Sequence, residues 1–108
     1  MFFKKILVVS CLSFLLSDLA FAQEEVFSKE SIEKGRGIYS QNCSPCHGPQ
    51  MADPQGAFDL RTFPPEQRNR FFYSVTNGKN GMPPWGGLFN KEEIATLWAY
   101  VMAGEKTK

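Results

Sequence analysis

Apolar side chains recur at helical spacing in three segments of the chain, and the clearest segment lies near the C-terminus. Its stripe follows an i, i+3, i+4, i+7 pattern and consists of Ile94, Leu97, Trp98 and Val101. Such a stripe predicts a helix with one buried face. Asn90 with Glu93 three positions later forms a capping-box pattern, which predicts where this helix begins, and Gly104 predicts its end.

The earliest segment, Lys29–Gln41, predicts a second helix with Ser28 as its N-cap. One face of this helix carries Ile32, Gly35, Ile38 and Tyr39. Gly35 and Gly37 each weaken a helix by roughly 1 kcal/mol relative to alanine. A glycine at such a position is expected where a second backbone approaches closely, and a frayed helix is the alternative.

The middle segment predicts a helix over Pro65–Thr76, because proline suits a first helical turn and Asn77-Gly78 is a typical end. The stretches on either side, residues 48–64 and 80–88, are rich in glycine and proline and predict loops. No alternating strand pattern is evident. The predicted fold class is all-α.

The N-terminus has the pattern of a secretory signal peptide. Two lysines precede an apolar run, Ile6–Leu16, and an Ala-Phe-Ala cleavage site follows at residues 20–22. Cleavage there removes residues 1–22 and leaves 23–108 as one domain, which is expected to be exported to the periplasm. The alternative is an uncleaved anchor, but the apolar run is shorter than the about 20 residues that a spanning helix needs.

The composition of residues 23–108 excludes some classes of function. The signal segment takes with it two lysines and one aspartate, so equal numbers of basic and acidic side chains remain. No basic stripe is left for nucleic acid, and no charged run for steering a strongly charged partner. A chain this short has a thin core and usually needs a disulfide, a metal or a similar staple for stability.

The strongest chemical signal is Cys43-Ser-Pro-Cys46-His47, which has the spacing that attaches a c-type haem. Each thiol can add to a haem vinyl group, and the adjacent imidazole can ligate the iron. A dithiol–disulfide site is an alternative, but it is typical of a βαβ pattern that this chain lacks. A zinc site would need a further Cys or His, and residues 23–108 contain none. The predicted cofactor is one covalent haem c with its iron.

The haem iron needs a second axial ligand, and the chain has only one histidine. Methionine is a common partner of histidine at c-type haems. Met51 follows His47 by only four residues, and Met102 lies near the end of the last predicted helix, where a packing role is expected. Met82 lies in a loop 35 residues after His47, before two prolines that restrict the backbone. Met82 is therefore the predicted distal ligand.

With these features, the chain resembles a small class I cytochrome c of the bacterial periplasmic kind. The similar segments are 35–48, with the first helix and the haem motif, 77–85, with the distal-ligand loop, and 90–101, with the C-terminal helix. The resemblance implies a cytochrome c fold in which the first and last helices cross. It also implies the residues at that crossing, which are Gly35, Tyr39, Leu97 and Tyr100.

The resemblance further implies a hydrogen bond that holds the proximal histidine. In this family a proline carbonyl in the loop after the motif accepts this bond, which fixes the imidazole ring. Pro49 and Pro54 are both candidates for the acceptor, and Pro54 has the better spacing. The candidates for a hydrogen bond to a haem propionate are Arg61, Arg68 and Trp85.

A haem with histidine and methionine ligands has no open position for a substrate, which predicts a one-electron carrier of a respiratory chain and not an enzyme. The expected partners are redox proteins: a periplasmic dehydrogenase, with a quinoprotein among the candidates, and a terminal oxidase or another cytochrome. The loop Met82–Phe89 is the expected docking surface, with the alternative that its aromatic side chains only cover the haem. The protein is expected to be a monomer.

Two alternatives to this function stay open. The first is a haem subunit of a periplasmic dehydrogenase or oxidase complex. The second is an open-site haem enzyme or gas-binding protein, which requires that Met82 does not ligate the iron.

Overall fold

The computed structural model describes residues 25–105, and the predicted signal peptide lies outside this range. The α-helices are α1 (Lys29–Asn42), α2 (Ser44–His47), α3 (Arg68–Asn77) and α4 (Lys91–Ala103). Three short 3-10 helices lie between them: η2 (Pro49–Met51), η3 (Leu60–Thr62) and η4 (Pro65–Gln67). Within residues 25–105 the only strand-like pairing is a single bridge between Lys79 and Met82. The all-α fold class is confirmed.

Both capped helices begin where the sequence predicts. The Ser28 hydroxyl accepts a hydrogen bond from the Ser31 amide at 3.0 Å and starts α1. At the start of α4 the capping box is complete, since Asn90 Oδ1 accepts from the Glu93 amide at 2.8 Å and the Glu93 carboxylate accepts from the Asn90 amide at 2.9 Å. Gly104 forms the C-cap of α4.

The middle helix begins later than predicted. The prolines at 64 and 65 start the 3-10 helix η4, and Gln67 then leaves the helical region with φ −109° and ψ 44°. Helix α3 therefore starts only at Arg68. It ends at Asn77 as expected, because Gly78 takes a positive φ of 84° that most residues adopt poorly.

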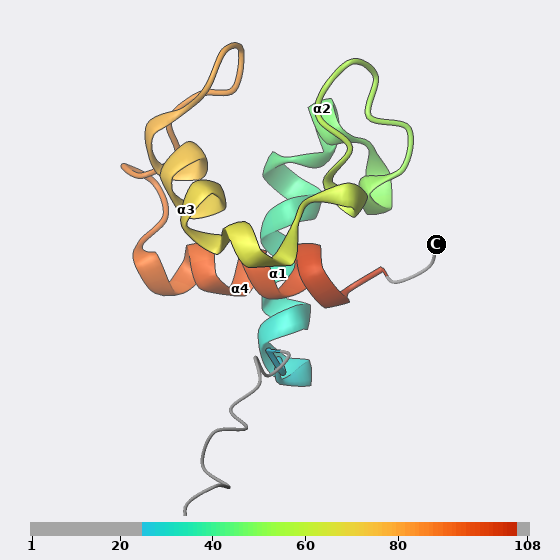
Figure 1. Cartoon of the computed structure of the whole chain (residues 1–108), viewed down its shortest axis with the longest axis vertical. Helices are drawn as coiled ribbons and strands as arrows, with labels where there is room; N and C mark the ends of the chain where they lie inside the picture. Colours follow the sequence, from blue (N-terminus) through green and yellow to red (C-terminus); the bar gives the residue numbers. More distant parts are fainter. Residues whose placement is uncertain (1–24, 106–108) are drawn as a thin grey trace, which may run out of the picture.

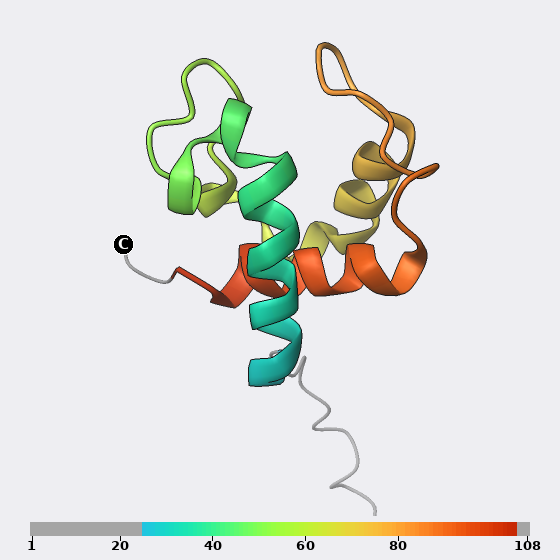
Figure 2. The ribbon, with the colours of Figure 1, turned by 180° about the vertical axis from the view of Figure 1, so that it is seen from behind.

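Helices α1 and α4 cross at the centre of the molecule (Figures 1 and 2). A Cβ atom on Gly35 would lie 1.9 Å from the backbone oxygen of Thr96, so only glycine allows this approach. The rings of Tyr39 and Tyr100 lie 5.0 Å apart beside it. The crossing implied by the resemblance is confirmed, with Thr96 as the backbone neighbour of Gly35. Gly37 has no such neighbour within 4 Å.

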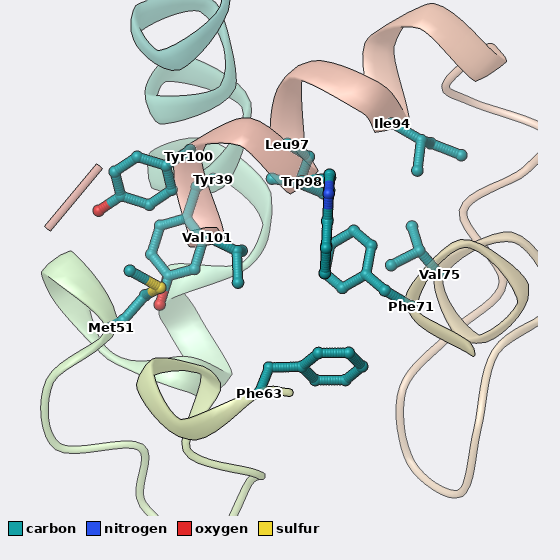
Figure 3. Close-up of a cluster of buried hydrophobic side chains, with 10 residues drawn as sticks. All are labelled: Tyr39, Met51, Phe63, Phe71, Val75, Ile94, Leu97, Trp98, Tyr100 and Val101. Atoms are coloured by element: carbon teal, nitrogen blue, oxygen red, sulfur yellow. The ribbon is translucent and has the colours of Figure 1, made fainter. Parts of the chain in front are cut away.

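The core extends from this crossing toward α3 (Figure 3). Trp98 is 1% exposed, and its ring lies 5.1 Å from Phe71 and 5.9 Å from Phe63. Its indole N–H donates to the Glu25 carboxylate at 3.1 Å, so the buried ring leaves no polar group unpaired. Tyr39 extends the core in the other direction, since its hydroxyl donates to the Gly48 carbonyl at 2.6 Å. The core therefore joins α1, α3 and α4 to the segment that follows α2.

The two glycines of α1 provide a matched pair of substitutions. Gly35→Ala is expected to lower the free energy of unfolding by about 1–3 kcal/mol, since its methyl group overlaps the α4 backbone. Gly37→Ala adds the same methyl group in open space and is expected to raise stability by up to about 1 kcal/mol. Denaturant unfolding of both variants measures the difference, and equal effects would contradict the close packing at Gly35.

Candidate haem site

Two arms of the chain rise from the α1–α4 crossing and bound a cavity between them. Figures 1 and 2 show α2 with the loop after it on one side, and α3 with the loop after it on the other. The cavity has a volume of about 620 Å³, which is in the range of cofactor sites. Its lining is mostly apolar and includes Leu60, Phe63, Phe71, Val75, Leu97 and Val101.

The first arm brings the predicted haem-binding residues to the cavity within one helical turn. Cys43 ends α1 and caps α2, and its carbonyl accepts from the amides of Cys46 at 3.1 Å and His47 at 2.9 Å. This turn places both thiols and the imidazole on the cavity wall. Neither cysteine forms a disulfide.

His47 is held by a backbone carbonyl, although by a different one from those predicted. Its Nδ1 lies 3.0 Å from the carbonyl oxygen of Phe58. A carbonyl only accepts, so Nδ1 carries the proton and Nε2 keeps the lone pair that a metal requires. The prediction of Pro49 or Pro54 is wrong, because Nδ1 bonds to the Phe58 carbonyl, and the two proline carbonyls accept the amides of Ala52 and Ala57 instead.

The thiol of Cys43 does not have the lowered pKa that is typical of a reactive thiol in a disulfide-exchange site. Burial, and to a lesser extent the nearby Cys46, raise its pKa to about 12. Cysteines of disulfide exchange have lowered pKa values instead. Within residues 25–105, no three His, Cys, Asp or Glu side chains gather in a group that could hold a metal ion by themselves.

The second arm brings Met82 to the cavity on a short, hydrogen-bonded loop. Lys79 and Met82 exchange two backbone hydrogen bonds, of 3.1 and 2.9 Å, around the turn Asn80-Gly81. Asn80 supplies the positive φ, 55°, that such a tight turn needs. Met82 itself is half-buried and lines the cavity.

Two carbonyls near the end of α3 accept hydrogen bonds from the second half of this loop. The Val75 carbonyl accepts from the Trp85 amide at 2.8 Å, and the Thr76 carbonyl accepts from the Gly86 amide at 3.1 Å. The last carbonyls of a helix have no partner within the helix, so the loop satisfies them. Gly78 allows this return, since a Cβ there would lie 2.8 Å from the Met82 carbonyl oxygen.

The two rival methionines do not line the cavity. Met51 is 1% exposed and packs in the core beside Tyr39 (Figure 3). Met102 is half-buried near the end of α4. Among the described methionines, Met82 alone reaches the cavity wall.

The structure shows which candidates for a propionate contact border the cavity. Arg61 pairs with Asp59 through two hydrogen bonds, of 3.0 and 2.9 Å, and Arg68 lies 3.8 Å from the Glu25 carboxylate. Neither of these arginines lines the cavity, whereas Trp85, the third candidate for a propionate contact, does. Sequence reasoning missed Arg70, which lines the cavity next to the core residue Phe71.

Comparison with known proteins agrees with this site. The family model described as cytochrome c oxidase, cbb3-type, subunit III matches residues 30–101. Cytochrome c6 of Nostoc sp. (strain PCC 7120 / SAG 25.82 / UTEX 2576) is 32% identical over 104 residues, which cover 92% of each chain. Cytochrome c6 of Porphyra purpurea is 30% identical over 105 residues, which cover 93% of this chain and 94% of the relative.

A third relative differs in size. The quinohemoprotein alcohol dehydrogenase ADH-IIG of Pseudomonas putida is 31% identical over 74 residues, which cover 67% of this chain but 10% of that protein. No solved structure matches the chain.

The chain therefore belongs to the c-type cytochrome family, as a small class I member, and is a haem electron carrier rather than an enzyme. Its cofactor is a covalent haem c with iron, and Cys43 and Cys46 with the following His47 fit the attachment motif. The cavity fits this cofactor, because it is apolar, is of suitable volume, and has two free thiols and an imidazole on one wall.

The Met82 loop yields a test of its own. Gly78→Ala is expected to cost about 1–3 kcal/mol, because alanine adopts the conformation at φ 84° poorly and its methyl group meets the Met82 backbone. Gly81→Ala, in the same loop, has open space around it and no left-handed φ, so a change of at most about 0.5 kcal/mol is expected. Unfolding and exchange of the Trp85 amide measure the effect. Equal protection in both variants would contradict the role of Gly78.

Proposed function

We propose that this cytochrome transfers single electrons through a haem attached to Cys43 and Cys46 and ligated by His47 and Met82. The observation that carries the proposal is that one cavity is lined by all four side chains. They come from two arms of the fold, separated by 35 residues of sequence. Such an arrangement can supply a histidine from one wall and a thioether from the other.

The residues around the two ligands restrict their movement. The Phe58 carbonyl accepts a hydrogen bond from Nδ1–H of His47, which fixes the ring and would make Nε2 a stronger donor to iron. The α3 carbonyls hold the loop that carries Met82. A c-type haem with these two ligands supplies a reversible one-electron couple and leaves no open position for a substrate.

The compartment we propose is the periplasm, reached through the signal peptide at residues 1–22. Maturation there would leave 23–108 as the haem domain. Among the described residues, no helix is both long and apolar enough to cross a membrane.

The partners we propose are a periplasmic dehydrogenase as donor and a respiratory cytochrome or terminal oxidase as acceptor. The match to part of a quinohemoprotein alcohol dehydrogenase favours a quinoprotein among the donors. The docking surface would be the loop after Met82, in which Trp85 and Phe89 stack at 5.7 Å and Leu88 is 62% exposed. A small apolar contact of this kind suits a short-lived complex.

Substitution of the distal ligand tests the haem coordination. In the haem-loaded protein, Met82→Ala is expected to abolish the weak sulfur-to-iron absorption band, lower the reduction potential and allow rapid carbon monoxide binding. Met102→Ala removes a methionine that does not line the cavity and is expected to keep the band. Absorption spectra with and without carbon monoxide distinguish these outcomes. Persistence of the band in Met82→Ala would refute the ligand assignment, and rapid carbon monoxide binding by the unaltered protein would favour the open-site alternative.

The size of the native protein tests whether it is a free carrier. Extracted at its native concentration, the haem-loaded chain is expected to elute as a monomer in size-exclusion chromatography, with light scattering as the measure of mass. A stable complex of fixed stoichiometry with a dehydrogenase or oxidase would instead assign it as a haem subunit. The match to a domain-sized part of the larger dehydrogenase is the observation that favours this second candidate, a haem subunit of a complex.

A further inference from the structure

The arginines of residues 25–105 differ in what they face. Three of the four have a carboxylate within 4 Å: Arg36 has Glu33 and Glu105, Arg61 has Asp59, and Arg68 has Glu25. Arg70 alone has no carboxylate at this distance within the described residues, and it donates to the neutral side-chain oxygen of Gln67. Since a guanidinium carries five N–H donors, Arg70 retains donors for another acceptor.

The position of Arg70 places this charge against the haem cavity. Its guanidinium carbon lies 4.7 Å from the ring centre of Phe63 and 5.7 Å from that of Phe58. Both rings line the cavity, as does Arg70 itself. Phe63 belongs to the core cluster beside Trp98 (Figure 3). Contact with two aromatic rings orients a guanidinium without neutralising it.

The permanently charged side chains that line the cavity are all positive. No aspartate or glutamate of the described residues lines it, and its permanent cations are Arg70 and Lys79. The other titratable groups that line it are Tyr39, Cys43, Cys46 and His47. The nearby Asp59 carboxylate is already paired with Arg61. Such a lining lacks a negative partner, and a haem carries two propionate carboxylates.

We propose that Arg70 binds one haem propionate at the rim of this cavity; the inference rests on the proposed function of the same site. The planar guanidinium pairs with a carboxylate through two parallel hydrogen bonds, which Lys79, a compact charge on an exposed chain, cannot form. The aromatic contacts hold the guanidinium ready for this pairing. The bound cation has two effects: it keeps the propionate ionised, and it raises the reduction potential by disfavouring the more positive ferric state.

The test compares three haem-loaded variants: Arg70→Gln, Arg70→Lys and the control Arg68→Gln. Arg68 lies two residues away on the same helix, carries the same charge and does not line the cavity. Haem content by mass spectrometry and the sulfur-to-iron band are measured first. If the haem or the sulfur-to-iron band is absent from the unaltered protein as well as from all variants, the proposed coordination is refuted, and this result is distinct from a failure of the role of Arg70.

The reduction potential is then measured against pH. In Arg70→Gln we expect a lower reduction potential at neutral pH. The potential falls with rising pH as the propionate ionises, and we expect this fall to occur at higher pH than in the unaltered protein. Arg70→Lys should give a smaller shift of both, because it keeps the charge and loses the paired hydrogen bonds. Arg68→Gln should change neither. Equal shifts in Arg70→Gln and Arg68→Gln would overturn the proposal, since the change in reduction potential would then follow from the loss of any nearby positive charge.

Discussion

The close approach of α1 and α4 at Gly35 is the constraint on which the rest of the structure depends. The two backbones meet where a side chain would overlap the Thr96 carbonyl, and Tyr39 and Tyr100 pack beside the contact. The Tyr39 hydroxyl then bonds to the carbonyl of Gly48, directly after the haem motif. The geometry of one helix crossing thereby determines where the first wall of the haem cavity lies.

The second wall depends on α3, which contacts α4 through an aromatic cluster. Phe71 and Trp98 carry this contact in the core. The end of α3 then supplies two carbonyls that hold the loop of Met82. Each wall is thus attached to the same central helix, α4, and their separation is set by rigid elements instead of by the loops between them. A site with two axial ligands on opposite walls needs this kind of support.

Sequence periodicity and caps were sufficient for α1, for α4 and for the end of α3, and motif spacing was sufficient to place Cys43, Cys46 and His47 together. These features depend on neighbours within about one helical turn, which a sequence displays directly. The start of α3 was mispredicted because the backbone leaves the helical region at Gln67, between η4 and α3, and the acceptor of His47 was mispredicted because it depends on how the long loop after the motif folds back. Arg70 was missed for a related reason. Its role depends on which arginines find carboxylates elsewhere in the fold, and Arg61 and Arg68 do.

The hydrogen bonds within Cys43–His47 determine how much of the site depends on the rest of the fold. The backbone hydrogen bonds that bring the two thiols and the imidazole together lie inside a single turn of chain, and the Phe58 carbonyl then orients the imidazole from the loop. A turn of this kind is built from neighbouring residues, so the half of the site that carries Cys43, Cys46 and His47 has a low contact order. The position of Met82 depends instead on the packing of α3 on α4, because carbonyls near the end of α3 hold the loop that carries Met82. One half of the site is therefore local in the chain, and the other half requires the tertiary fold.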